Sequence, residues 1–114
     1  MFAAVFLKAY LEEFPDYKFV ISQASQLAWL EEDDPELFAR VAAAVSAGRF
    51  VILGGTWVEM DANISSSESF SRQFLLGQRY FEEKFGARSN IFWLPDTFGY
   101  SSQIPQLCRL ADMK

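Results

Sequence analysis

Two polar segments that follow apolar runs contain the residues of this sequence best suited to chemistry. Asp96 follows the run 91–94 (IFWL), and Glu59 and Asp61 come shortly after the run 50–53 (FVIL). In parallel sheets the loops at the carboxyl ends of strands converge on one face, where enzymes place their reactive groups. A buried strand at 91–94 would deliver the carboxylate of Asp96 to that face, so Asp96 is the first candidate.

Asp96 also has a purely structural interpretation. An Asp directly after a strand is often a turn former or a helix N-cap, whose side chain accepts backbone N–H groups. Position alone therefore leaves both a structural and a catalytic role open for Asp96.

Three other features that can mark a functional site have simpler explanations. Gly54-Gly55 has neither a GxGxxG pattern nor a P-loop lysine beside it, so a phosphate site is poorly supported. The four consecutive carboxylates Glu31–Asp34 seldom converge on one metal ion, and we expect a solvated loop that ends in the N-cap of the next helix. Cys108 has no His to activate it, because the sequence contains none, and we expect a small core residue.

The composition predicts a globular protein that does not bind nucleic acid or membranes. The chain has 114 residues, 51% of them hydrophobic, and a net charge of −5. Nucleic acids and anionic membranes select basic surfaces. A single cysteine cannot form an internal disulfide, and the charge of segment 1–8 comes after its apolar residues, unlike in a signal peptide. These features predict a soluble cytoplasmic protein.

Hydrophobic periodicity predicts helices that alternate with short strands. The expected helices are 2–13, 23–30, 35–47, 65–85 and 103–113, and the expected strands are 18–22, 50–53 and 91–94. Such alternation is typical of parallel strands joined by right-handed crossovers, so we predict an α/β domain. Ser65 and Glu68 fit a capping box at the start of the longest helix.

That longest helix carries an aromatic stripe that indicates a core-facing side. Phe70, Phe74, Gly77, Phe81 and Phe85 follow one another at spacings of three and four residues. A glycine inside a helix costs about 1 kcal/mol relative to alanine. We therefore expect that Gly77 allows another backbone to pack closely against the helix.

Four segments resemble a known enzyme family. Segment 92–107, FWLPDTFGYSSQIPQL, is similar to the nucleophile segment of family-38 glycoside hydrolases, the α-mannosidases, and most of all to their cytosolic and bacterial branch. Segment 54–63 (GGTWVEMDAN), segment 72–81 (RQFLLGQRYF) and segment 22–30 (SQASQLAWL) resemble other motifs of that family. They occur in the family's order and at its spacing across nearly the whole chain.

The resemblance implies a partial domain. Residues 1–114 are similar to one segment of an N-terminal catalytic domain that is a (β/α) barrel-like α/β fold. A complete barrel of this kind takes about 250 residues, so three strands cannot close one. The two unpaired sheet edges would favour packing against the rest of the catalytic domain or self-association.

The resemblance also implies a chemistry for Asp96. In this family the matching carboxylate is the nucleophile of a retaining double displacement on α-linked mannose, and it also ligates a zinc ion. The implied partner is a mannose-containing oligosaccharide. The other zinc ligands include His residues, which this sequence lacks, and the acid/base Asp lies beyond the position of Lys114. We therefore expect that the isolated chain is inactive.

Several residues keep two interpretations. Trp57 can stack on a sugar ring or pack in the core, and Glu59 and Asp61 can contact sugar hydroxyls or, for Asp61, organise a turn. Arg72 and Arg79 are expected to pair with neighbouring carboxylates. The alternative for the whole chain is a non-catalytic α/β module that binds a protein partner through its exposed sheet edge.

Overall fold

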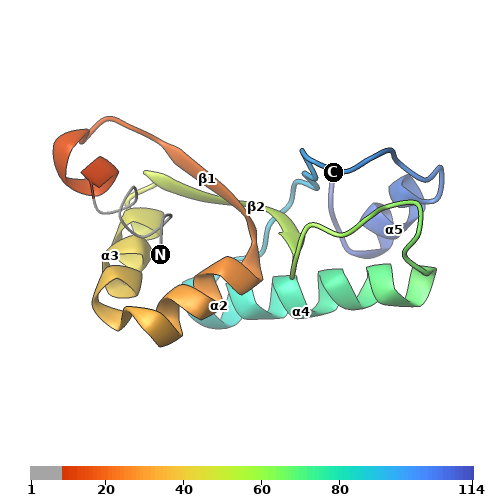
Figure 1. Ribbon diagram of the computed structural model, residues 1–114, viewed down its shortest axis with the longest axis horizontal. Coiled ribbons are helices and arrows are strands. Elements are labelled where there is room, and N and C mark those ends of the chain that lie inside the picture. The colour runs from red at the N-terminus through yellow and green to blue at the C-terminus, as the bar shows by residue number, and fades with distance from the viewer. Residues whose placement is uncertain (1–8) are drawn as a thin grey trace.

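The computed structural model describes residues 9–114, which form helices around a small parallel sheet (Figure 1). The strands are β1 (Phe19–Gln23) and β2 (Phe50–Thr56), and the helices are α2 (Ala24–Asp33), α3 (Pro35–Ser46), α4 (Ser67–Phe85) and α5 (Ile104–Leu110). Residues 9–13 are also helical, and the remainder of the helix predicted at 2–13 lies outside the described residues.

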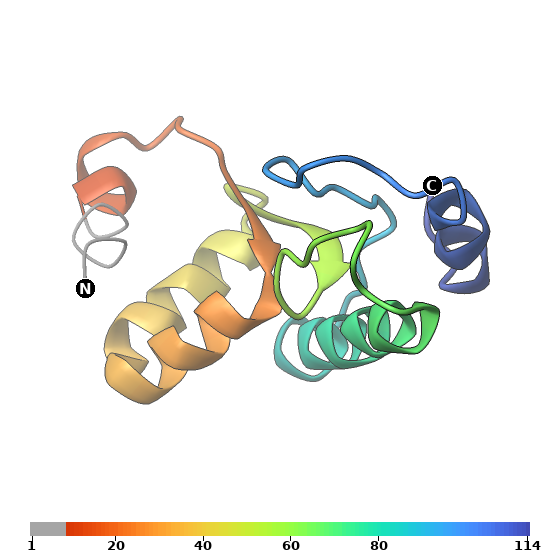
Figure 2. The same ribbon diagram turned by 45° about the vertical axis from the view of Figure 1, so that its right-hand side comes forward.

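The two strands confirm the predicted parallel βα unit. β1 and β2 pair in parallel with Phe19 opposite Phe50 and Ile21 opposite Ile52, and α2 and α3 form the crossover between them (Figure 2). The register shifts between Ile21 and Gln23, so that Gln23 lies opposite Thr56. The carboxyl ends of both strands therefore open towards the same loops.

The strand predicted at 91–94 was wrong. Segment 91–94 lies beside β2 and bonds to it once, from Gly54 N–H to the carbonyl of Ile91 (2.9 Å), without forming a ladder. The amide of Phe92 donates instead to the carbonyl of Lys114 (3.4 Å), which follows α5. The ring of Phe92 packs against α4, 5.6 Å from that of Phe74. The segment is thus held by side chains and by the residues after α5.

The acidic segment after Leu30 was also predicted incorrectly in part. Helix α2 continues to Asp33, and Glu31 accepts hydrogen bonds from the hydroxyl of Tyr80 (3.2 Å) and from the ammonium group of Lys84. These contacts with α4 replace the expected solvated loop at Glu31. Asp34 does cap α3 as predicted, because its carboxylate accepts the Leu37 N–H at 2.9 Å.

The ends of α4 and α5 differ from the prediction for local reasons. The cap of α4 is Ser66, whose hydroxyl accepts the Ser69 N–H (3.2 Å), and so the predicted capping box at Ser65 was wrong by one residue. Helix α5 ends at Leu110 because Asp112 has a φ of 57° and the Met113 N–H returns to the carbonyl of Cys108 (2.9 Å). This left-handed termination is the pattern of a Schellman motif.

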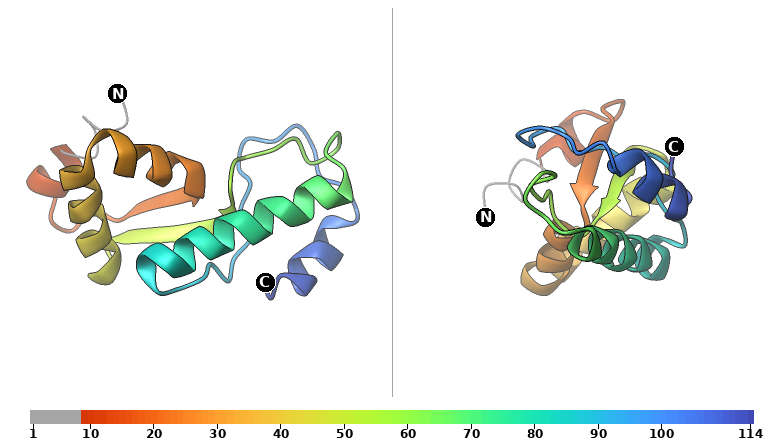
Figure 3. Two further views of the ribbon diagram at one scale, coloured as in Figure 1. Left: turned by 90° about the horizontal axis from the view of Figure 1, so that it is seen from below. Right: turned by 90° about the vertical axis from the view of Figure 1, so that its right-hand side faces the viewer.

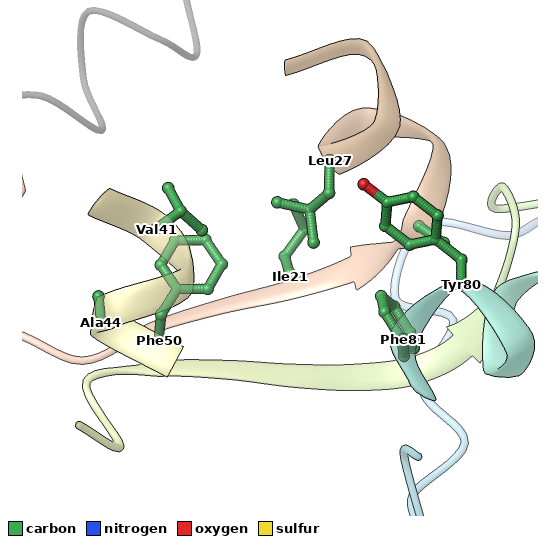
Figure 4. Close-up of a cluster of buried hydrophobic side chains, with 8 residues drawn as sticks. Ile21, Leu27, Val41, Ala44, Phe50, Tyr80 and Phe81 are labelled. Atoms are coloured by element: carbon green, nitrogen blue, oxygen red, sulfur yellow. The ribbon is translucent and has the colours of Figure 1, made fainter. Parts of the chain in front are cut away.

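The long helix α4 runs past both the sheet and α5 (Figure 3), and it contributes side chains to two hydrophobic clusters. The first cluster lies between the sheet, α2, α3 and the second half of α4, and it contains Ile21, Ala24, Leu27, Val41, Ala44, Phe50, Tyr80 and Phe81 (Figure 4). The second lies between the first half of α4, α5, the loop 57–66 and the segment 91–103. It contains Met60, Ala62, Phe70, Phe74, Leu94, Ile104, Cys108 and Met113. The predicted aromatic stripe supplies residues to both, with Phe85 packed at the edge of the first cluster.

Gly77 lies where α4 crosses the end of β2. A Cβ at this position would come within 2.4 Å of the Thr56 carbonyl carbon and within 2.6 Å of the Gly55 oxygen. The expected close packing of two backbones is therefore confirmed. It places the middle of α4 directly against the strand end from which the loop 57–66 departs.

Candidate functional site

Asp96 lies in an exposed turn that follows segment 91–94. Pro95 and Asp96 form the turn, and within residues 9–114 the Asp96 carboxylate makes no hydrogen bond or ion pair. A turn-forming or helix-capping side chain would accept local amide groups. The structure therefore does not support the structural interpretation of Asp96, and its carboxylate is available to an outside molecule.

The loop that carries Asp96 is joined to the loop 57–66 by the side chain of Thr97. The Thr97 hydroxyl accepts the Ala62 N–H at 3.3 Å and donates to the carbonyl of Met60 at 3.4 Å. The two loops run side by side above the first half of α4 (Figure 3). Segments 35 to 37 residues apart in the sequence are thereby held together at the end of β2.

Asn63 makes a second connection between the same loops. Its side-chain amide donates to the carbonyl of Phe98 at 3.0 Å. The Asp61 carboxylate accepts the backbone N–H groups of Asn63 (2.8 Å) and Ile64 (2.9 Å). This is an Asx turn, so the turn-organising interpretation of Asp61 is confirmed.

Glu59 ties the loop 57–66 to the end of β1. Its carboxylate accepts the Ser22 hydroxyl at 2.8 Å, and its backbone N–H donates to the side-chain oxygen of Gln23 at 3.2 Å. Glu59 is half-buried at the carboxyl end of the sheet. One oxygen of its carboxylate is engaged inside the chain, whereas no described group engages Asp96.

Trp57 belongs to the core. Its half-buried indole meets the ring of Tyr80 edge-on at 5.9 Å, and its backbone N–H donates to the carbonyl of Gln73 at 3.1 Å. The side chain of Gln73 also accepts the Val58 N–H at 2.9 Å. Because both amides are held by α4, the position of this helix determines where the loop 57–66 begins.

Burial alters the acidity of two groups near these clusters. The pKa of the Cys108 thiol is raised by desolvation, as expected for a small core residue without a thiolate role. The pKa of the Tyr80 hydroxyl is also raised, first by desolvation and then by the charge of Glu31 and its hydrogen bond to that carboxylate. Arg72 and Arg79 pair with the carboxylates of Glu68 and Glu83, each at 2.7 Å, but both partners lie on α4 itself, so these pairs do not anchor the helix to another element.

The residues present do not fit a complete zinc site. Within residues 9–114 no three His, Cys, Asp or Glu side chains come together in a way that could hold a metal ion, and the sequence contains no His. Structural and catalytic zinc sites need at least three protein ligands. Asp96 can therefore contribute to such a site only together with ligands from elsewhere.

A groove of about 630 Å³ lies between α4 and α5, apart from Asp96. It is lined by Ser71, Phe74, Leu75, Gln78, Arg79, Glu82, Glu83, Arg88, Leu107, Leu110 and Ala111, none of which belongs to the two loops. Leu75 and Leu110 on its rim are 65% and 78% exposed.

No helix among the described residues is long and apolar enough to cross a membrane.

The sequence made Asp96 a candidate but did not indicate the contacts around it. Thr97 and Asn63 lie in two different predicted loops, and nothing in their spacing indicates that these loops meet. The hydrogen bond from Ser22 to Glu59 joins residues 37 positions apart. The sequence indicates it only in that both residues follow apolar runs.

Comparison with known proteins gives consistent matches over most of the chain. The model of the glycosyl hydrolases family 38 N-terminal domain matches residues 5–114. An α-mannosidase of Saccharomyces cerevisiae is 59% identical over 102 residues, and α-mannosidase 2C1 of Homo sapiens is 50% identical over 97 residues. These alignments cover 89% and 85% of this chain but only 9% of each relative.

Solved structures contain the same arrangement of elements. The crystal structure of an α-mannosidase from Enterococcus faecalis V583 superposes with a TM-score of 0.80 at 31% identity, covering 98% of this chain and 12% of that one. A 4-α-glucanotransferase from Thermococcus litoralis superposes with a TM-score of 0.77 at 21% identity over 95% of this chain and 17% of that one, which is a likeness of fold alone. The chain thus spans a small part of the length of the proteins that it matches.

Proposed function

This chain belongs to the family defined by the glycosyl hydrolases family 38 N-terminal domain, and from that membership we propose that it forms part of an α-mannosidase. Residues 1–114 would be one segment of a larger, barrel-like catalytic domain that hydrolyses α-linked mannose in oligosaccharides. The names of the relatives support this assignment, since those at 50% identity or more are α-mannosidases. The observation that carries the proposal is the exposed carboxylate of Asp96, which lies within the matched region and has no partner among residues 9–114.

Asp96 is assigned the role of nucleophile. Its carboxylate would attack the anomeric carbon of mannose and form a covalent glycosyl-enzyme, while the bond to the leaving oxygen breaks and that oxygen takes a proton from an acid. Water would then attack the same carbon and release the carboxylate. The Asp96 carboxylate is suited to this step, because no contact with residues 9–114 must be broken before it attacks.

The rest of the chemistry would come from other parts of the domain. Retaining glycosidases need a second carboxyl group about 5–5.5 Å from the nucleophile, and we assign that group to the part of the domain that follows Lys114. We also assign Asp96 as one ligand of the zinc ion that the family resemblance implies, with the remaining ligands outside this chain. The nucleophilic attack itself is attributed only to the carboxylate.

The groove between α4 and α5 is assigned to contact with the rest of the domain. Its charged rim is internally neutralised, since Arg79 pairs with Glu83 and Arg88 with Glu82, both at 2.7 Å. The exposed Leu75 and Leu110 would then favour an apolar neighbour. We further propose a cytoplasmic location, which the single buried cysteine supports.

A chimaera with the Saccharomyces cerevisiae α-mannosidase tests the function. Residues 5–114 would replace the matching segment of that enzyme, and hydrolysis of an aryl α-mannoside would be measured beside the unmodified enzyme. We expect clear turnover, and its loss by at least about 1,000-fold in Asp96→Asn, since an amide is a very poor nucleophile for this step. Thermal unfolding of both chimaeras provides the folding control.

Two outcomes would reject the assignment. A folded chimaera that cannot turn over the mannoside would favour the alternative of a non-catalytic binding module. An Asp96→Asn chimaera that keeps its activity would show that another group is the nucleophile.

A further inference from the structure

We propose that Thr97 and Asn63 are positioning residues, which together hold the Asp96 carboxylate in place from the neighbouring loop. Asp61 contributes to this arrangement indirectly, through Asn63. The inference rests on the proposed role of Asp96 and assigns functions to residues that do not themselves touch the substrate.

Among the described residues, the Asp96 carboxylate is not oriented by contacts of its own. It has no hydrogen-bond or ion-pair partner among residues 9–114, so its position depends on the backbone on either side. On the preceding side Leu94 is 1% exposed, and its carbonyl accepts the Tyr100 hydroxyl. The preceding backbone is therefore fixed by burial and by a bond within the same loop.

On the following side, the backbone is fixed by the other loop. Thr97 uses one hydroxyl both as an acceptor, from the Ala62 N–H, and as a donor, to the Met60 carbonyl. Met60 and Ala62 are themselves 9% and 3% exposed and belong to the second hydrophobic cluster, so the backbone that Thr97 contacts is held by the core. The residue next to Asp96 is thus anchored to the core by a single side-chain oxygen.

The second anchor is a chain of contacts that starts at Asp61. Its carboxylate holds the backbone of Asn63, and the Asn63 side chain then donates to the carbonyl of Phe98, two residues after Asp96. Gly99 leaves room for this contact, because a Cβ there would lie 2.5 Å from the Asn63 side-chain nitrogen and the φ of Gly99 is +106°. Phe98 is 89% exposed, so its ring does little to hold the turn.

Fixed anchors matter because a nucleophile must stand at a set distance and angle from the carbon that it attacks. A misplacement of about 1 Å can lower the rate by about 100-fold. Loss of either anchor would let Asp96 sample other positions, and this would slow the chemical step more than it weakens sugar binding. In this arrangement the carboxylate of Asp61 has a structural role, because it accepts the backbone N–H groups of Asn63 and Ile64.

The first test measures the order of the turn in the isolated chain by ¹⁵N relaxation. In the native chain we expect an order parameter for the Asp96 amide near 0.85, falling below about 0.6 in Thr97→Val and in Asn63→Ala. Thr97→Ser keeps the hydroxyl and should restore the native value. Ser46→Ala, which removes an exposed hydroxyl on α3, is the matched control and should leave the turn unchanged.

The second test measures kinetics in the chimaera described above. Thr97→Val and Asn63→Ala should each lower kcat by about 10- to 100-fold, with KM within about twofold, and Thr97→Ser should recover most of kcat. Far-UV circular dichroism would verify that each variant is folded. Unchanged order at Asp96 in both Thr97→Val and Asn63→Ala, or unchanged kcat in both, would overturn the proposal.

The two proposals fail in different ways. If Asp96→Asn leaves the chimaera active, the nucleophile is assigned wrongly, whatever the relaxation data show. If Asp96→Asn abolishes turnover but the turn stays ordered and active without the Thr97 hydroxyl and the Asn63 amide, only the positioning role is wrong.

Discussion

Gly77→Ala is the substitution whose effect the structure determines most closely. The added methyl group would lie 2.4 Å from the Thr56 carbonyl carbon, whereas ordinary contact begins at 3.4 Å, so α4 and β2 would have to separate by about 1 Å. The nearest atoms belong to the backbone of β2 and cannot rotate away as a side chain would. The strain must therefore move the helix or the strand end.

The net free energy follows from two opposing effects. Alanine is the better helix former by about 1 kcal/mol. Overpacking a core usually costs about 1–3 kcal/mol, and the backbone contacts at Gly77 put this site at about 3 kcal/mol. We therefore expect the free energy of unfolding to fall by about 2 kcal/mol, which corresponds to a Tm lower by about 8 °C in a domain of this size.

Urea unfolding followed by far-UV circular dichroism measures this change. Ser71→Ala is the matched control, because it places alanine on an exposed position of the same helix and should alter stability by no more than about 0.5 kcal/mol. In addition, Gly77→Ala should shift the amide resonances of Trp57 and Val58, which Gln73 holds one turn earlier in α4. If Gly77→Ala were as stable as the native chain, the close packing of α4 on β2 would not be a constraint and the reasoning would be refuted.

Two further predictions concern pH and activity. Burial raises the pKa of Cys108 above its ordinary value of 9.0 and that of Tyr80 above 10.0, so the folded chain binds these protons more tightly than the unfolded chain does. The free energy of unfolding that these two groups contribute should thus be fully present below pH 9 and should decrease as pH rises further. Urea midpoints at pH 8 and pH 10.5 measure this decrease, and Tyr80→Phe should make it smaller. A urea midpoint that does not change between these pH values would contradict the prediction. The isolated chain, incubated with zinc and an aryl α-mannoside, should release no aryl alcohol above the background of Asp96→Asn, and robust turnover would contradict the view that one carboxylate is insufficient.

The elements that the sequence predicted well are those specified by local patterns. The aromatic spacing along α4 and the left-handed glycine at Gly86 place that helix almost residue by residue. The β-branched and aromatic runs before Gln23 and before Gly54 identify both strands, because a strand buried between helices needs an apolar run. Local signals of this kind do not depend on what lies nearby in space.

The features that were missed depend on contacts between distant residues. The apolar run 91–94 has the composition of a strand, but the Phe92 amide bonds to Lys114 and its ring packs on α4. Glu31 has the sequence context of a solvated loop, yet it bonds to Tyr80 and Lys84, which lie 49 and 53 positions further along the chain. Tertiary contacts of this kind override local preference.

The candidate site shows the same division. The resemblance to family-38 glycoside hydrolases makes Asp96 the candidate nucleophile, whereas the link from Asn63 to Phe98 depends on the path of two loops across 35 residues. Asp61 illustrates why residue type alone is insufficient, since one oxygen of its carboxylate accepts two backbone N–H groups and organises the turn.

If Asp96 forms the covalent glycosyl-enzyme, mechanism-based trapping should label it. The chimaera would be treated with a fluorinated α-mannosyl fluoride, whose glycosyl-enzyme hydrolyses slowly, and the labelled peptide would be identified by mass spectrometry. We predict one added sugar per chain, attached to Asp96, and no labelling of the Asp96→Asn variant. A sugar attached to any other residue would show that Asp96 is not the nucleophile.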